Sequence, residues 1–258
     1  MKSRSHSKKK MIALISAVPS EGSFLVRRLR LERASQSYLP LFYHGEGEKS
    51  GLLYAVSGTG KTNAAHAATV LIREYSPRLL VNFGVGGAYP PAGLALGDVM
   101  VAESEIYGDE GVRDSDGFHG AEYMGIPFLQ RGRKKYYNEF ALDRGLSRRA
   151  LASASSVFKG ADEARKVGAG RFITVSTCTG TRERAAELGQ KWGAICENME
   201  GAAIAHICAL YGIPLIEIRG VSNIVDERDK AEWDLGLASR NCCKAVVQLL
   251  KALTTDHS

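Results

Sequence analysis

The sequence lacks the patterns that mark membrane, secreted and zinc-binding proteins. It has no run of about 18 apolar residues, so no membrane-spanning helix is expected. Its N-terminus has no long apolar stretch of the kind found in secretory signals. Five cysteines are present, an odd number without C-x-x-C spacing, which predicts neither a disulfide framework nor a zinc site. We therefore expect a cytoplasmic protein with reduced thiols, and no metal, cofactor or membrane partner.

Acidic residues are absent from the first ten positions, M-K-S-R-S-H-S-K-K-K, which contain five lysines and arginines. Setting these positions aside lowers the formal net charge from +6 to +1, so the rest of the chain is nearly neutral. A basic arm can bind nucleic acid, but such a role would depend on this arm alone. We expect residues 1–10 to be a disordered basic extension and expect no nucleic-acid partner.

Residues 11–258 contain no linker rich in proline or serine and no internal repeat. Apolar runs of strand length alternate with helix-like segments throughout, which predicts a single α/β domain. The continuous apolar strands predict a central, mostly parallel mixed sheet surrounded by helices. Strands are expected at 11–18, 39–44, 51–57, 78–83, 98–103, 172–176, 194–196 and 215–220, and helices at 23–34, 62–75, 181–191, 201–211 and 238–252. The polar, glycine-bearing stretch Tyr107–Arg133 is expected to be irregular and to serve binding or an interface.

Two glycine-rich segments follow predicted strands. The first, A-V-S-G-T-G-K-T at Ala55–Thr62, nearly matches a phosphate-binding P-loop, but it begins with alanine and no strand with a magnesium-binding aspartate follows. The second, Gly84–Gly87, lacks the downstream acid of a dinucleotide site. Neither pattern supports a nucleotide cofactor, although both can direct backbone N–H groups at a ligand.

Polar side chains occur where predicted strands end, the usual place for ligands in open α/β folds. Glu21 follows the first strand, Glu200 precedes a helix of small residues, and Ser222-Asn223 end the strand 215–220. Each has an ordinary alternative role, since a carboxylate at a helix start is favoured by the helix dipole. Together, two carboxylates and an amide suit cleavage of a glycosidic bond.

The order and spacing of five motifs resemble the purine nucleoside phosphorylase and nucleosidase superfamily over about residues 11–252. These motifs are Gly58-x-Gly60-Lys61, Asn82-x-Gly84-x-Gly86-Gly87, Leu96–Val99, Glu197–Glu200 and Arg219–Asn223. Within the superfamily the chain is most similar to the futalosine hydrolases, through Gly86–Pro90, Tyr107–Val112, Val175–Thr181 and Val221–Asn223.

The resemblance implies a nucleoside phosphorylase-like fold and an N-glycosyl hydrolase over 11–258. The implied reaction releases hypoxanthine from futalosine and leaves dehypoxanthinyl futalosine, a step in menaquinone biosynthesis. Two other enzyme activities remain open, a 5′-methylthioadenosine/S-adenosylhomocysteine nucleosidase and a 6-oxopurine nucleoside phosphorylase. A nucleoside-binding module without turnover is the alternative from another class.

The resemblance also assigns roles to the catalytic candidates. Glu200 matches the acid that binds the ribose hydroxyls, and Met199 matches a residue that packs beside the sugar. Glu21 matches the carboxylate that activates water in the nucleosidases. Asn223 stands where adenine-cleaving nucleosidases carry aspartate. Because an amide can donate to N7 or O6 of a 6-oxopurine, Asn223 favours inosine-like over adenosine-like substrates.

Further residues are expected to border the substrate. Val85 occupies a position where the superfamily commonly has serine, and the glycine-rich segments contain no arginine, which favours hydrolysis over phosphorolysis. Gly86 and Ser222 lie beside it in the motifs, and Thr177 and Thr179 align loosely with the base pocket. Arg113 and His119 are candidates for the carboxylate at the far end of the substrate, although an exposed loop charge is their ordinary role. Superfamily members bury the segment 107–133 against a second subunit, which implies a homo-oligomer.

Overall fold

The computed structural model describes residues 11–34, 39, 41–44, 51–160 and 164–255. The extension expected at 1–10 lies outside these residues. Within them, none of the helices combines the length and apolar character needed to cross a membrane.

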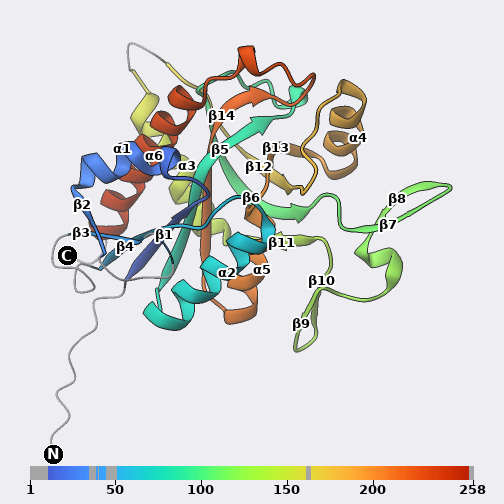
Figure 1. Cartoon of the computed structure of the whole chain (residues 1–258), viewed down its shortest axis with the longest axis horizontal. Helices are drawn as coiled ribbons and strands as arrows, with labels where there is room; N and C mark the ends of the chain where they lie inside the picture. The colour runs from blue at the N-terminus through green and yellow to red at the C-terminus, as the bar shows by residue number, and fades with distance from the viewer. Residues whose placement is uncertain (1–10, 35–38, 40, 45–50, 161–163, 256–258) are drawn as a thin grey trace, which may run out of the picture.

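A ten-stranded mixed sheet forms the centre of the fold (Figure 1). Its strands are β1 (Ile12–Ser16), β2 (Leu31–Arg33), β3 (Leu41–His44), β4 (Leu52–Val56), β5 (Leu79–Ala88), β6 (Val99–Tyr107), β11 (Glu139–Ala141), β12 (Val167–Thr174), β13 (Ala194–Asn198) and β14 (Leu215–Ile224). β1 lies between β4 and β5 and is parallel to both, as expected of a buried strand that is apolar on both faces.

Five of these strands pair in a closed ring. β5 pairs with β14, β14 with β6, β6 with β12, β12 with β13, and β13 returns to β5. A closed ring of strands has no free edge among its members, so its backbone groups are paired on both sides. β5 and β14 therefore lie in fixed register, with Arg219 opposite Gly84 and Gly220 opposite Val85.

Helices cover both faces of the sheet (Figure 1). Their bounds are α1 (Pro19–Leu29), α2 (Lys61–Val70), α3 (Arg144–Phe158), α4 (Arg182–Trp192), α5 (Gly201–Tyr211) and α6 (Leu235–Thr255). α1, α3 and α6 pack together over one core, and α2 and α5 pack over another. The predicted α/β fold, with a central mixed sheet surrounded by helices, is confirmed.

Three local predictions were wrong. The helix expected at 23–34 is α1, which starts at Pro19 because proline suits the first helical position, and which ends at Leu29 before the short strand β2. β5 does not end at Phe83 but continues to Ala88, since its glycines allow close approach of other elements in a regular strand. α3 was not predicted, because the face it buries is made largely of serine and alanine and gives little apolar signal.

The stretch 107–133 is not wholly irregular. It contains the hairpin β7 (Gly111–Asp114) and β8 (Gly117–Gly120), then β9 (Leu129–Arg131), which pairs with β10 (Lys134–Tyr136). Both hairpins extend away from the central sheet (Figure 1).

Candidate active site

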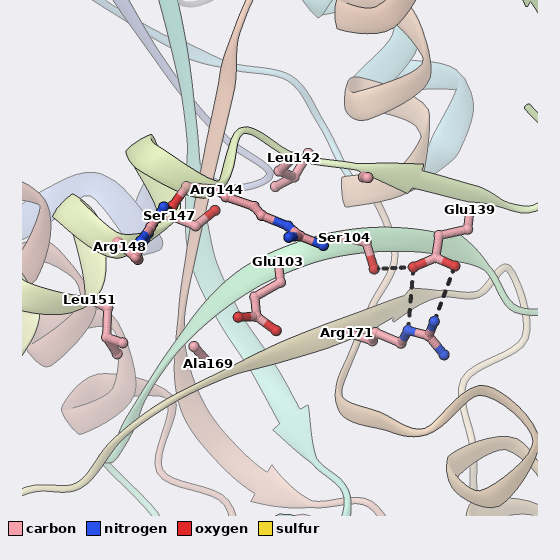
Figure 2. Close-up of a pocket in the computed structure, with 11 residues that line it drawn as sticks. Glu103, Ser104, Glu139, Leu142, Arg144, Ser147, Arg148, Leu151, Ala169 and Arg171 are labelled. Atoms are coloured by element: carbon pink, nitrogen blue, oxygen red, sulfur yellow. Dashed lines mark hydrogen bonds and ion pairs between the residues drawn. The ribbon is translucent and has the colours of Figure 1, made fainter. Parts of the chain in front are cut away.

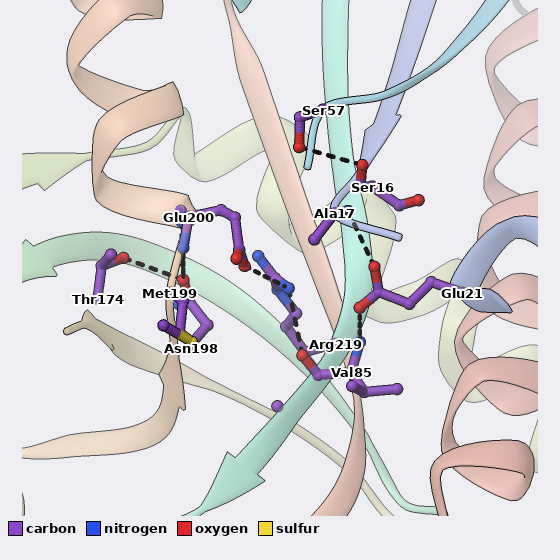
Figure 3. A network of polar contacts seen from close by, with 12 residues as sticks. Ser16, Ala17, Glu21, Ser57, Val85, Thr174, Asn198, Met199, Glu200 and Arg219 are labelled. Atoms are coloured by element: carbon purple, nitrogen blue, oxygen red, sulfur yellow. Dashed lines mark hydrogen bonds and ion pairs between the residues drawn. The ribbon is translucent and has the colours of Figure 1, made fainter. Parts of the chain in front are cut away.

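Glu21 and Glu200 come together around a buried arginine, Arg219 (Figure 3). Glu21 lies in the first turn of α1, Glu200 immediately precedes α5, and Arg219 lies within β14. All three side chains are buried, with at most 4% of any residue exposed. Side chains from distant parts of the sequence thus come together at one place in the fold.

The Glu21 carboxylate is held by three backbone N–H groups. Its Oε2 accepts from Ala17 and Val18, at 2.9 and 3.0 Å, and its Oε1 accepts from Val85 at 2.9 Å. Burial raises the pKa of Glu21 above its ordinary value of 4.5, against the opposing effects of Arg219 and the backbone donors. Since Oε1 takes only one of these donors, it keeps acceptor capacity for a further group.

Glu200 is fixed through both its side chain and its backbone. Its Oε1 accepts from the Gly60 N–H at 3.0 Å, and its Oε2 lies 3.5 Å from Arg219 Nη1. Its own N–H donates to Asn198 Oδ1 at 2.9 Å. The glycine segment that resembled a P-loop therefore directs a backbone N–H at a carboxylate of the protein.

Arg219 was not among the predicted site residues. Its Nε donates to Glu217 Oε1 at 2.9 Å, its Nη1 donates to Val85 O at 3.2 Å, and its Nη2 has no hydrogen-bond partner among the described residues. The sequence did contain a signal, because Glu217 and Arg219 interrupt an apolar strand two residues apart and so share one face. Burying a charged group is costly, so two charged residues inside a buried strand indicate a functional position.

The predicted residues at the end of β14 lie beside β5. Ser222 Oγ donates to Asn223 Oδ1 at 2.9 Å and also lies 3.2 Å from Gly86 O. Asn223 is half-buried, and its Nδ2 donates to Ile224 O at 3.1 Å. An amide nitrogen carries two hydrogens, so Asn223 retains a second donor.

The loop after β12 packs against the segment that leads to Glu200. Thr179 is buried, and both its N–H and its hydroxyl donate to the Glu197 carboxylate, at 2.9 and 2.5 Å. Tyr89 donates to the same carboxylate at 2.8 Å. Cys178 Sγ lies 3.4 Å from Met199 Sδ, whereas Thr177 is exposed. Glu197 and Tyr89 were not predicted as site residues.

The two basic candidates for the far end of the substrate lie on the β7–β8 hairpin. Arg113 pairs with Glu187 of α4 at 3.6 Å, and 61% of its side chain is exposed. His119 lies 3.0 Å from Asp114. The structure does not bring either residue into contact with Glu21, Glu200 or Arg219.

Lys61 forms two ion pairs, whereas Arg113 and His119 form one each. Its Nζ pairs with Asp109 at 2.5 Å and with Glu110 at 3.0 Å. Asp109 also accepts the N–H groups of Ser176 and Thr177, at 2.6 and 3.3 Å. The lysine of the glycine-rich segment is therefore neutralised by the protein itself.

A separate cavity of about 500 Å³ lies between β6, β11, β12 and α3 (Figure 2). Its polar wall includes Glu139, which accepts from Ser104 and pairs with Arg171. None of the predicted site residues lines this cavity, so it is distinct from the carboxylate site.

Comparison with known proteins agrees with the fold. The profile of the phosphorylase superfamily matches residues 11–255, and the chain belongs to that superfamily. Futalosine hydrolase from Thermus thermophilus is 35% identical over 201 residues, which cover 78% of this chain and 82% of that protein. The 5′-methylthioadenosine/S-adenosylhomocysteine nucleosidase from Mycobacterium bovis is 26% identical over 253 residues, covering 94% and 98% of the two chains.

Two solved structures are similar over nearly the whole chain. The methylthioadenosine/S-adenosylhomocysteine nucleosidase from Neisseria meningitidis, in complex with methylthio-immucillin-A, has a TM-score of 0.76 at 28% identity, covering 94% of this chain and 99% of that one. Futalosine hydrolase from Helicobacter pylori shares the fold, with a TM-score of 0.77 at 17% identity and coverage of 94% and 98%. The predicted enzyme class, an N-glycosyl hydrolase, and the resemblance to futalosine hydrolases are confirmed.

Proposed function

We propose that this nucleosidase hydrolyses the N-glycosidic bond of futalosine, releasing hypoxanthine and leaving dehypoxanthinyl futalosine for menaquinone biosynthesis. The observation that carries the proposal is the arrangement of Glu21 and Glu200 on either side of Arg219, with the Asn223 amide on the same strand as the arginine. Support for this substrate comes from the Thermus thermophilus relative, which is named futalosine hydrolase.

Each residue has a distinct part in the proposed reaction. Glu200 and the Met199 backbone hold the ribose while the bond from C1′ to the base loosens toward an oxocarbenium-like state. Glu21 orients the attacking water through Oε1 and takes its proton. Asn223 donates to the leaving hypoxanthine, whose negative charge is stabilised by donated hydrogen bonds. Gly86, Ser222, Thr177 and Thr179 border the base, and Arg113 remains a candidate for the far carboxylate.

Hydrolysis is favoured over phosphorolysis because the cations near the glycine segments already have acidic partners. Lys61 is paired with Asp109 and Glu110, and Arg219 with Glu217 and Glu200. Val85 offers a side chain that cannot bind phosphate. A phosphorylase instead needs cationic side chains free to hold a phosphate ion.

The deciding experiment incubates the purified protein with futalosine, inosine and 5′-methylthioadenosine, with and without phosphate, and follows the free base by chromatography. We expect hypoxanthine from futalosine at the same rate with and without phosphate. Adenine from methylthioadenosine would instead identify the alternative nucleosidase. Release that requires phosphate would identify a phosphorylase, and binding without release would identify a nucleoside-binding module.

Asn223→Asp is expected to shift the preference toward 6-aminopurine nucleosides by about tenfold in kcat/KM, equal to ~1.4 kcal/mol. A carboxyl group can donate to N7 only as an acid and, when ionised, repels the O6 acceptor of hypoxanthine. The ratio of kcat/KM for methylthioadenosine and futalosine measures the shift. Gln130→Glu makes the same amide-to-acid change on the exposed β9 strand and should leave the ratio unchanged. An unchanged ratio in Asn223→Asp would remove Asn223 from base recognition.

We also propose that the enzyme is a cytoplasmic homo-oligomer. Tyr123, Met124 and Ile126, which follow the β7–β8 hairpin, have 62, 40 and 68% of their surface exposed. An exposed apolar group of this kind favours burial against another subunit. All five cysteines are free, in agreement with a reducing compartment.

A further inference from the structure

Two more carboxyl groups lie beneath Glu200, and the proposed reaction does not use them. They belong to Glu105 of β6 and Glu217 of β14, and neither residue is exposed to solvent. Both reach the same point at Gly201, where an added side-chain carbon would collide with Glu105 Oε1 and lie 2.6 Å from Glu217 Oε1. Two carboxylates that share one buried space repel each other, so they do not both ionise without a large cost.

Each member of the pair supports a different part of Glu200. Glu105 Oε1 accepts from Asn198 Nδ2 at 2.7 Å, and Asn198 Oδ1 accepts the N–H groups of Glu200 and Gly201, at 2.9 and 2.7 Å. Glu105 thus acts on the backbone that carries Glu200. Glu217 binds Arg219, which lies against the Glu200 carboxylate, and so acts on its side chain.

Arg219 forms its ion pair with Glu217 and not with Glu105, so the negative charge of the pair is placed on Glu217. The Thr174 hydroxyl lies 2.7 Å from Glu105 Oε2 and 3.0 Å from Asn198 Oδ1. These contacts accommodate a proton on Glu105 Oε2, because Glu105 can then donate to Thr174 while the hydroxyl donates to Asn198. Thr174 Oγ1 can still accept from the Ala202 N–H at 2.7 Å.

The surroundings favour the same protonation state. Burial raises the pKa of Glu105 well above its ordinary 4.5, and the charge of Glu217 raises it further. The other titratable groups near the pair are Arg219, Tyr107, Cys196 and Cys208. Burial raises the pKa of the Tyr107 hydroxyl and of both thiols, which leaves Arg219 as the charged group among these four.

We propose that Glu105 and Glu217 form a singly protonated acid pair that positions Glu200, with the proton on Glu105 and the single negative charge on Glu217 facing Arg219. The assignment of ribose binding to Glu200 is part of the proposed function, and the positioning role rests on it. The pair fixes the Glu200 backbone through the neutral acid and its carboxylate through the charged one. Both are positioning residues, because Glu105 acts on Glu200 through Asn198 and Glu217 acts on it through Arg219.

The protonation state is tested by infrared difference spectroscopy of the full chain at neutral pH. Subtracting the spectrum of Glu105→Gln from that of the wild type is expected to leave the C=O stretch of a protonated carboxyl group. Loss of a carboxylate band instead would overturn the proposal. This measurement needs no substrate, so it remains decisive even if futalosine is not the substrate.

The positioning role is tested by the kinetics of paired variants. Glu105→Gln should keep kcat within about threefold, because an amide can donate to Thr174 and accept from Asn198 as the neutral acid does. Glu217→Gln should lower kcat on the order of 100-fold, because Arg219 loses its nearest counter-charge and displaces the Glu200 carboxylate. Glu103→Gln, an exposed change on the same strand as Glu105, is the matched control and should have no effect.

Two outcomes would contradict the positioning role, a loss in Glu105→Gln as large as that in Glu217→Gln, or full activity in both variants. If Glu217→Gln does not fold, the activity and infrared spectrum of Glu105→Gln still decide the location of the proton. A wild type inactive on every nucleoside tested would count against the proposed function and leave the infrared result standing.

Discussion

Changing Glu21 to glutamine is expected to lower kcat by about 10²–10⁴-fold, the usual contribution of a general base. The amide cannot take a proton from the attacking water. It also places a donor among the backbone N–H groups of Ala17, Val18 and Val85, so the free energy of unfolding should fall by about 1–3 kcal/mol. Steady-state kinetics measure the first effect, and urea unfolding followed by circular dichroism measures the second.

The pH profile gives a second measure of the same role. Glu21 must be ionised to accept a proton, and burial raises its pKa above 4.5. The kcat/KM of the wild type should therefore fall as the pH decreases through this raised pKa, and this acid limb should be absent from the residual activity of Glu21→Gln. Glu32→Gln, on the exposed part of β2, is the control for removing one acid. A folded Glu21→Gln variant with wild-type kcat would exclude Glu21 as the base.

Changing Arg219 to methionine is expected to lower the free energy of unfolding by about 3–5 kcal/mol, as when one partner of a buried ion pair is removed. Arg219 is 1% exposed and lies among the carboxylates of Glu21, Glu200 and Glu217, which would lose their common cation. Methionine fills part of the space without charge. Urea unfolding of both proteins measures the difference.

The loss of stability in Arg219→Met should depend on pH in a defined direction. Burial raises the pKa of Glu21 and Arg219 opposes this rise, so without the arginine the folded-state pKa of Glu21 lies further above its unfolded value. The protonated form of Glu21 then supports folding at low pH, and this support is lost as the pH rises through the raised pKa. The deficit should be smaller at about pH 5 than at about pH 8. Arg171→Met removes a half-exposed arginine paired with Glu139 and should cost at most about 1 kcal/mol. A deficit that is constant with pH would mean that Arg219 contributes by packing alone.

The fold was predictable where a segment makes apolar contacts along its whole length. β1 is apolar on both faces and is buried between two strands, so its sequence alone identified it. α3 was not predicted because its buried face includes Ser147 and Ser153, whose polar side chains do not mark a buried helix face. Closure of the ring was not predictable either, since strands far apart in the sequence, such as β5 and β13, meet there.

The site was predictable where residues match family motifs. Glu21 and Glu200 were assigned in this way, and the structure places them around one arginine. The groups around them were missed. Glu105 and Glu197 act through tertiary contacts that no local pattern encodes, whereas the charged pair Glu217 and Arg219 in an apolar strand was a signal that was not used. The carboxylates could thus be recognised in the sequence, whereas the network that sets their positions required the structure.

The loop that follows β12 is tied to the rest of the molecule largely through two acidic side chains, Asp109 and Glu197. The carboxylates around Arg219, by contrast, lie on the ring of strands and on the starts of helices. The loop can therefore be remodelled without rebuilding the framework that holds the proposed catalytic carboxylates. Such modularity offers a physical route by which one ancestral scaffold diversifies into enzymes for different nucleosides while inheriting the same bond-breaking apparatus.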